Sequence, residues 1–137
     1  MMKTKMVLWA VVAALVVLGA GWLWGAGGRW AIEGQARATM LRLQLAEGRA
    51  ALTAARIDVF ELNFGNASRH IEQGKRALTA AAGQLDQDGP AESATAVRDA
   101  LAKAADAQQL AGSVDQAANS RLADAVKALD RAASANR

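Results

Sequence analysis

The feature that most constrains this chain is an uninterrupted apolar run near its N-terminus. Residues 6–28 contain no charged side chain, whereas Lys3 and Lys5 precede them and Arg29 follows them. Crossing a bilayer core of about 30 Å takes roughly 20 apolar residues in a helix that rises about 1.5 Å per residue. The sequence therefore predicts a transmembrane helix over residues 6–28, behind a short tail over residues 1–5.

A cleaved signal peptide is the main alternative for the same run. Signal peptides have an apolar stretch of about 7–15 residues that ends in a small-x-small cleavage site. Here the run is longer, and a cut after Ala20 would place the large Leu18 where a small residue is required. The chain has no cysteine that could carry a lipid. We therefore expect an uncleaved anchor.

The residues that flank the run predict its orientation and its interfaces. Lys3 and Lys5 favour a cytoplasmic N-terminus, and the counter-pull of Arg29 is weak because long domains translocate largely regardless of charge. Tryptophan is enriched at membrane interfaces. The expected interfacial residues are Trp9, Trp22, Trp24, Arg29 and Trp30.

The amino-acid composition predicts where the protein lies in the cell and argues against nucleic acid as a partner. Alanine dominates and arginine outnumbers lysine, which is typical of GC-rich bacteria, so we expect a single-pass protein of the bacterial inner membrane with a periplasmic C-terminal domain. Lys3 and Lys5 account for two of the 16 basic residues, so residues 29–137 hold 14 against 13 acidic ones. This near balance gives no case for binding nucleic acid.

The rest of the chain has the apolar period of packed helices. Apolar and small residues follow one another at spacings of three and four, a mean of 3.5, and no segment alternates with a period of two. These seams comprise Leu41, Leu45, Gly48, Leu52, Ala55, Val59 and Leu62; Ala67, Ile71, Gly74, Leu78, Ala81 and Leu85; Ala94, Val97, Leu101 and Ala104; and Ala118, Leu122, Ala125, Leu129 and Ala132. The predicted class is all-α.

Short breaks between the seams predict antiparallel neighbours. Breaks fall at residues 63–66 and 112–113, where Asn or Ser could cap the next helix and Gly could take a left-handed conformation. The only proline, Pro90, ends a Gly- and Asp-rich turn. We therefore expect a first helical hairpin over residues 29–85, a turn over 86–90 and a second hairpin over 91–137.

The two predicted hairpins resemble each other. The segment that begins at Arg49 aligns with the one that begins at Arg98, at an offset of 49 residues. Ala67 and Ile71 align with Ala118 and Leu122 at an offset of 51. In an alanine-rich chain such matches arise easily, so duplication and chance both stay open.

The segment around Phe64 resembles the tetratricopeptide-type helical hairpin. In that family an aromatic residue in the turn is followed by a small residue and then by large and small residues one and two turns later, as in Phe64, Ala67, Ile71 and Gly74. The alanines at 51, 54 and 55 depart from the first-helix signature. The resemblance implies paired antiparallel helices with a role in protein–protein docking, centred on Phe64, Gly65, Ala67 and Ile71. A four-helix bundle is the alternative arrangement.

Residues suited to catalysis or metal binding are few. The chain has one histidine, no cysteine and no tyrosine, and Ser68 and His70 do not face each other on a helix because they are two residues apart. Asp86 and Asp88 resemble the start of a calcium loop that lacks its later ligands, so a turn is the simpler interpretation. We expect no enzyme, no metal and no cofactor.

Function follows from the anchor and the helices. Gly21 and Gly25 form a GxxxG pair that allows close packing of another span in the membrane. The leading interpretation is a membrane-anchored docking module for other membrane or periplasmic proteins, with a homo-oligomer as a further option. The alternatives are an accessory single-span subunit of a respiratory or photosynthetic complex and, less favoured, an extracytoplasmic sensor domain.

Overall fold

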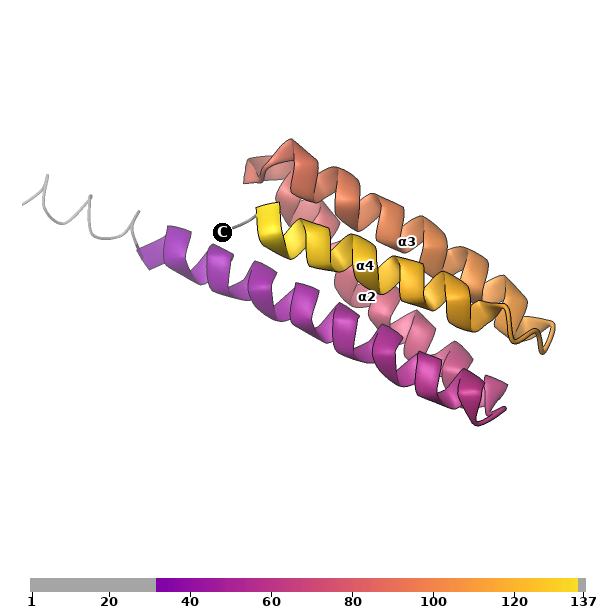
Figure 1. Cartoon of the computed structure of the whole chain (residues 1–137). Coiled ribbons are helices and arrows are strands. Elements are labelled where there is room, and N and C mark those ends of the chain that lie inside the picture. Colours follow the sequence, from indigo (N-terminus) through magenta and orange to yellow (C-terminus); the bar gives the residue numbers. More distant parts are fainter. Residues whose placement is uncertain (1–31, 136–137) are drawn as a thin grey trace, which may run out of the picture. The chain divides into compact units, whose positions relative to one another are not determined.

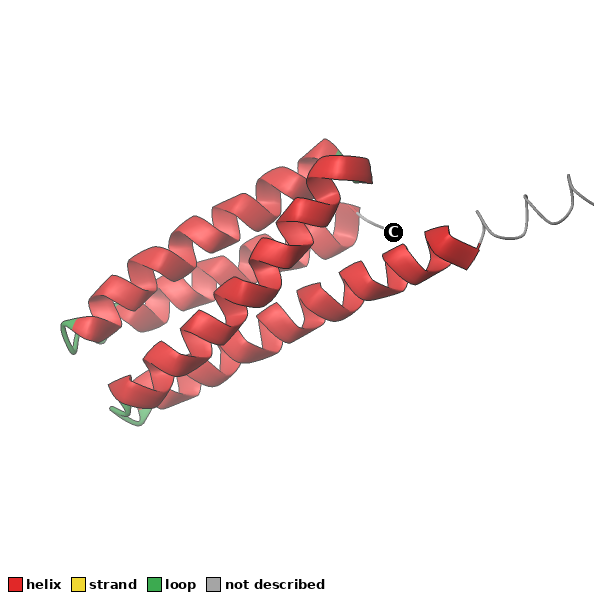
Figure 2. Ribbon diagram, turned by 180° about the vertical axis from the view of Figure 1, so that it is seen from behind, coloured by secondary structure: helices red, strands yellow, loops and turns green. Residues whose placement is uncertain are grey.

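The computed structural model describes residues 32–135, and within them it consists of four helices and no strand (Figures 1 and 2). The first helix covers residues 32–60. It is followed by α2 (Phe64–Asp88), α3 (Ala91–Gly112) and α4 (Ala118–Ala135). The predicted all-α class is therefore confirmed.

The predicted membrane span lies outside the described residues. Trp9, Trp22, Trp24, Arg29, Trp30, Gly21 and Gly25 lie outside them too. Among residues 32–135, no helix combines the length and the apolar character needed to cross a bilayer.

The chain divides into two units. The first comprises Met1–Thr39, of which the structure describes residues 32–39 as helical and exposed. The second is a compact unit that begins at Met40 and contains the remainder of the first helix with α2, α3 and α4. All contacts described below lie within this second unit.

The four helices of the compact unit close into an up-and-down bundle. The first helix packs against α2, α2 against α3, and α3 against α4. The ring is completed by contacts between the first helix and α4, where Arg49 Nε lies 2.8 Å from Asp130 Oδ1 and Arg56 Nε lies 3.0 Å from Asn119 Oδ1. A closed ring is the arrangement of a four-helix bundle, whereas successive repeats of a solenoid contact only their neighbours.

One continuous core runs through the bundle, formed by the seams that the sequence predicts. The largest fully buried apolar side chains are Leu52, Ile71, Leu78, Leu122, Leu129, Val59 and Val97. Alanine fills most of the remaining space, above all in α3, where Val97 is the largest fully buried side chain. Small residues such as these allow neighbouring helices to approach closely.

The closest approach joins the first helix to α2 through two glycines. A Cβ added to Gly48 would lie 2.6 Å from Leu78 Cδ2, and one added to Gly74 would lie 3.0 Å from Leu52 Cδ2. Each leucine therefore occupies the space that the facing glycine leaves. This reciprocal fit fixes the register of the first hairpin.

The first and last turns end their helices in the same way. Asn63 N–H donates to Asp58 O and Leu62 N–H to Val59 O; Asp115 N–H donates to Leu110 O and Val114 N–H to Ala111 O. This is the Schellman pattern, which needs one left-handed residue. The sequence predicts glycine in that conformation, but Leu62 and Val114 adopt it, each with φ of 60°.

In each of these turns a polar side chain accepts a backbone hydrogen bond at or just before the start of the next helix. Asn63 accepts a hydrogen bond from Asn66 N–H at the start of α2, as the sequence predicts. Asp115 accepts one from Ala117 N–H ahead of α4. The middle turn is tighter: α2 continues through residues 86–88 and stops at Gly89, because Pro90 disfavours a helical conformation in the residue before it.

Burial supports a correspondence between the two hairpins at nearly constant offsets. Buried positions of the first helix and α3 are related by 52 residues, and those of α2 and α4 by 51. The pairs are Leu41/Ser93, Leu45/Val97, Gly48/Ala100, Leu52/Ala104, Ala55/Ala107 and Val59/Ala111, then Ala67/Ala118, Ile71/Leu122, Gly74/Ala125, Ala77/Ala128, Leu78/Leu129 and Ala81/Ala132. Leu62 and Val114 also differ by 52, so the turns favour this register over the offset of 49 read from sequence.

Candidate functional site

The first and last turns place large apolar side chains in solvent at one end of the bundle. Both turns lie at the same end, opposite the middle turn (Figures 1 and 2). Phe60 is 80% exposed, Leu62 61% and Val114 67%. We call these three residues the apolar end.

Two residues of the apolar end lie where the backbone itself favours glycine. A left-handed conformation costs an L-residue roughly 1–2 kcal/mol, and for a β-branched residue such as Val114 it is a marked outlier. Folding gains little in return, since both Leu62 and Val114 remain mostly exposed. Such outliers tend to cluster at functional sites, so the apolar end is the first candidate.

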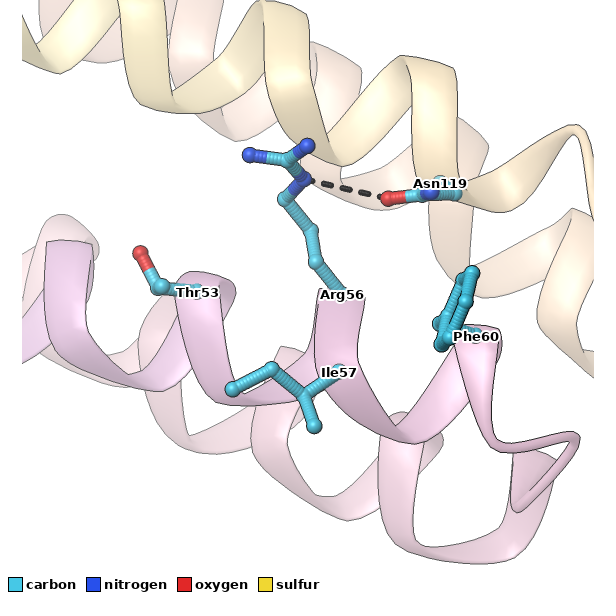
Figure 3. A pocket seen from close by; sticks show the side chains of 5 residues that line it. All are labelled: Thr53, Arg56, Ile57, Phe60 and Asn119. Carbon is cyan, nitrogen blue, oxygen red and sulfur yellow. Dashed lines mark hydrogen bonds between the residues drawn. The ribbon is translucent and has the colours of Figure 1, made fainter.

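A shallow groove of about 310 Å³ lies beside the apolar end, between the first helix and α4. It is lined by Thr53, Arg56, Ile57, Phe60 and Asn119. Figure 3 shows Arg56 reaching from the first helix to Asn119 at the start of α4, with Phe60 one turn further along. Ile57 is 56% exposed, so the wall on the first helix is apolar and open to solvent.

The residues that the tetratricopeptide resemblance assigns to the turn have other surroundings. Phe64 is half-buried at the start of α2 and packs against the core. Ala67 and Ile71 are fully buried, whereas Gly65 is exposed with nothing within 4 Å of a Cβ placed on it. In this bundle Phe64, Ala67 and Ile71 pack the hairpin, and the apolar surface of this end comes from Phe60, Leu62 and Val114.

His70 has a partner that sequence reasoning missed. Its Nδ1 lies 2.6 Å from Oδ2 of Asp58, which is nearly buried, so the pair connects the last turn of the first helix with the second turn of α2. The spacing of 12 residues across a turn gave no local signal. Among residues 32–135, no group of three or more His, Cys, Asp or Glu side chains could hold a metal ion.

A second hollow, of about 570 Å³, lies over the start of α3 and the end of α4. Asp99 lies at its edge and accepts hydrogen bonds from Lys103 and, at 2.9 Å, from Arg131 Nη2. The Lys103 hydrogen bond, with the charges of both cations, holds the pKa of Asp99 below its usual value against a smaller effect of burial. These charges satisfy one another, which indicates a structural network.

Leu62 and Val114 are the residues that sequence reasoning missed as surface features. Leu62 was assigned to the core seam because its spacing continues that of Val59. Their position was the signal that could have identified them: each lies two residues after the end of a helix and directly before Asn63 or Asp115, where glycine is the usual residue.

The chain matches no protein-family model, no curated protein and no solved structure. The tetratricopeptide resemblance therefore stays a prediction.

Proposed function

We propose that this protein is a non-catalytic docking module, held at the bacterial inner membrane by residues 6–28, whose periplasmic bundle binds another membrane or periplasmic protein. The anchor rests on the long uncharged run, which exceeds the apolar length of a signal peptide. The docking surface is the apolar end.

One observation carries the docking part of the proposal. At both Schellman turns, the position that favours glycine holds a large apolar side chain that folding leaves exposed. Glycine at Leu62 and Val114 would remove the cost of the left-handed backbone, and these apolar side chains gain no burial within the bundle in exchange. Exposed apolar side chains that cost stability are expected where a partner buries them.

The first helix places the apolar end at a distance from the start of the bundle. Residues 40–60 of the first helix span about 30 Å at roughly 1.5 Å per residue, so the apolar end lies that far along the helix from Met40. A partner with an apolar segment would bury Leu62 and Val114 together at this end of the bundle.

Capture from membranes tests the docking surface. Tagged full-length protein would be purified in mild detergent, and bound proteins would be quantified by mass spectrometry for the wild type and for a Leu62→Gly/Val114→Gly variant. Glycine suits the left-handed backbone, so this variant keeps the fold while it loses both side chains. Met40→Ala, which removes another exposed apolar side chain far along the first helix, is the matched control.

We expect a defined partner with the wild type and the control, and at least a tenfold loss with the double glycine variant, since two buried anchors contribute roughly 1.5–3 kcal/mol each. Equal capture by all three proteins would refute the docking surface. Recovery of one large stoichiometric complex would favour the accessory-subunit alternative.

Intact-mass measurement on protein extracted from membranes tests the anchor. The proposal requires a mature chain that still contains residues 6–28. A chain that begins near Gly28 would remove the anchor and leave the docking surface to be tested separately.

A further inference from the structure

The first helix carries a second uncharged stripe on its outward face. The stripe is spaced at intervals of three and four along the helix. Its members within the compact unit are Leu43, Ala46, Ala50, Thr53, Ile57 and Phe60. All six are exposed, and the three largest, Leu43, Ile57 and Phe60, are 60%, 56% and 80% exposed.

The stripe and the core-facing seam lie on opposite sides of the same helix. An α-helix turns by about 100° per residue, so positions 43, 50 and 57 lie roughly 180° from the seam that contains Leu45, Leu52 and Val59. The side chains of the seam are buried in the bundle, whereas those of the stripe remain exposed. The wall of the groove in Figure 3 on the first helix is the last part of this stripe.

Charges border the stripe with opposite signs on its two sides. Arg42, Arg49 and Arg56 recur every seven residues along one side, and Glu47 and Glu61, fourteen residues apart, lie along the other. In heptad terms the stripe supplies positions a and d, the arginines occupy g, and the glutamates occupy e. This is the layout of a two-stranded coiled coil.

The signs specify one orientation. In a parallel pair, g of one helix faces e of the next heptad in the other helix, which sets Arg42 against Glu47 and Arg56 against Glu61 of the second copy. In an antiparallel pair, g faces g and e faces e, so arginine would face arginine. The pattern is therefore self-complementary only when two identical helices run in the same direction.

The arginines and glutamates concerned are open to such contacts. Arg42, Glu47 and Glu61 are exposed. Arg56 is half-buried and donates its Nε–H to Asn119 Oδ1, and Figure 3 shows its two terminal nitrogens on the side of the guanidinium away from Asn119. Arg49 pairs with Asp130 of the same chain at the surface of the bundle and would face the uncharged Ala54, so the pairing does not require it.

We propose that two copies of this protein pair in parallel along the outward face of the first helix, with Leu43, Ile57 and Phe60 as anchors and small residues between them. The inference deepens the proposed function and rests on it at one point: two anchors in one bilayer orient both copies alike and raise their effective concentration. In a parallel pair Phe60 of each copy is buried between the two helices, while Leu62 and Val114 of both copies lie at the same end and stay available to a partner.

Disulfide trapping tests the pairing directly, because the natural chain has no cysteine. Full-length protein in detergent micelles would carry one cysteine at a time: Ala46→Cys, Ala50→Cys or Thr53→Cys, each a small residue of the stripe. In a parallel pair each of these positions faces its own copy closely enough for a disulfide. Thr79→Cys, exposed on α2, is the matched control for Thr53→Cys.

We expect a covalent dimer from all three stripe variants under mild oxidation, and at least a fivefold lower yield from Thr79→Cys. A dimer from only one stripe position indicates an antiparallel or crossed contact and overturns the proposal. Equal yields at all four positions indicate random collision, and no dimer at any stripe position indicates no pairing; both overturn it.

Charge reversal tests the orientation independently. Arg42→Glu or Glu47→Arg alone should each weaken pairing of the full-length protein, roughly tenfold, because like charges then face each other at two symmetric places. An equimolar mixture of the two variants should pair as well as the wild type. If the mixture pairs no better than either variant alone, the charge pattern does not specify the contact.

These results separate the inference from the proposed function. Pairing at positions 46, 50 and 53 without any partner captured through Leu62 and Val114 supports the inference and refutes the docking surface. A partner captured by a protein that does not pair supports docking and refutes the inference.

Discussion

Glycine should be a more stable substitute than alanine at Leu62 and at Val114. An alanine at either position still has a Cβ in a left-handed conformation, which costs roughly 1–2 kcal/mol, whereas a glycine has no Cβ and avoids that cost. Glycine loses about 0.5–1 kcal/mol more backbone entropy on folding than alanine does. Since both substitutions delete the apolar side chain, the difference between them isolates the backbone, at about 0.5–1 kcal/mol per site in favour of glycine.

The two positions lie in separate turns, so the effects should add to about 1–2 kcal/mol between the double glycine and the double alanine variant. In a domain of this size each kcal/mol shifts Tm by about 4–8 °C. Thermal unfolding of the full-length protein in detergent, followed by circular dichroism, would resolve the difference.

At a control position inside a helix, glycine should instead be less stable than alanine. Ala80 is exposed in the interior of α2, where replacing alanine with glycine should lower stability by about 1 kcal/mol. Equal stability of the alanine and glycine variants at 62 and 114, or higher stability with alanine, would contradict the left-handed turns. Partner capture should fall to the same extent in both variants, because binding depends on the missing side chains and not on stability.

Three further predictions follow from packing and charge. Gly48→Ala should destabilise the bundle by about 1–3 kcal/mol, because its Cβ would lie 2.6 Å from Leu78 Cδ2; Gly83→Ala, with nothing within 4 Å, should instead stabilise by about 0.5–1 kcal/mol in the same urea titration. Phe64→Ala should cost about 1.5–3 kcal/mol, less than the roughly 3–5 kcal/mol for a fully buried phenylalanine, since Phe64 is half-buried; an unchanged melting curve would refute its packing role. The pKa of Asp99 is lower in the folded protein than its ordinary value of 3.8, so the ionised carboxylate stabilises the bundle at pH values above 3.8, and this stabilisation is lost as the pH falls from there through the lowered pKa. Asp99→Asn should remove this part of the acid sensitivity in unfolding titrations.

The helical seams were predictable because one physical signal, a mean spacing of 3.5 residues, is repeated along the chain. The cores of the helices, including Leu52, Ile71, Leu78 and Leu122, follow those seams. The same periodicity makes it hard to align the first hairpin with the second, because shifting the alignment by three or four residues matches the apolar positions almost as well. Only the turns, at Leu62 and Val114, favour an offset of 52.

The apolar end was harder to predict because it depends on backbone conformation. Leu62 continues the seam by spacing, but the helix ends two residues earlier and the left-handed turn directs it outward. The contact between His70 and Asp58 likewise depends on how two helices meet, which no local pattern encodes. Closure of the ring through Arg49 and Asp130 joins residues 81 apart and could not be read from sequence either.

Site-specific photo-crosslinking shows whether the apolar end is where a partner binds. Benzoylphenylalanine would be placed at position 62 or 114 of the full-length protein in intact membranes, and at Gln87, exposed near the far end of α2, as the control. The account predicts a discrete adduct of one mass from positions 62 and 114 that is absent from position 87. Adducts of equal yield from all three positions, or an adduct from position 87 alone, would contradict it.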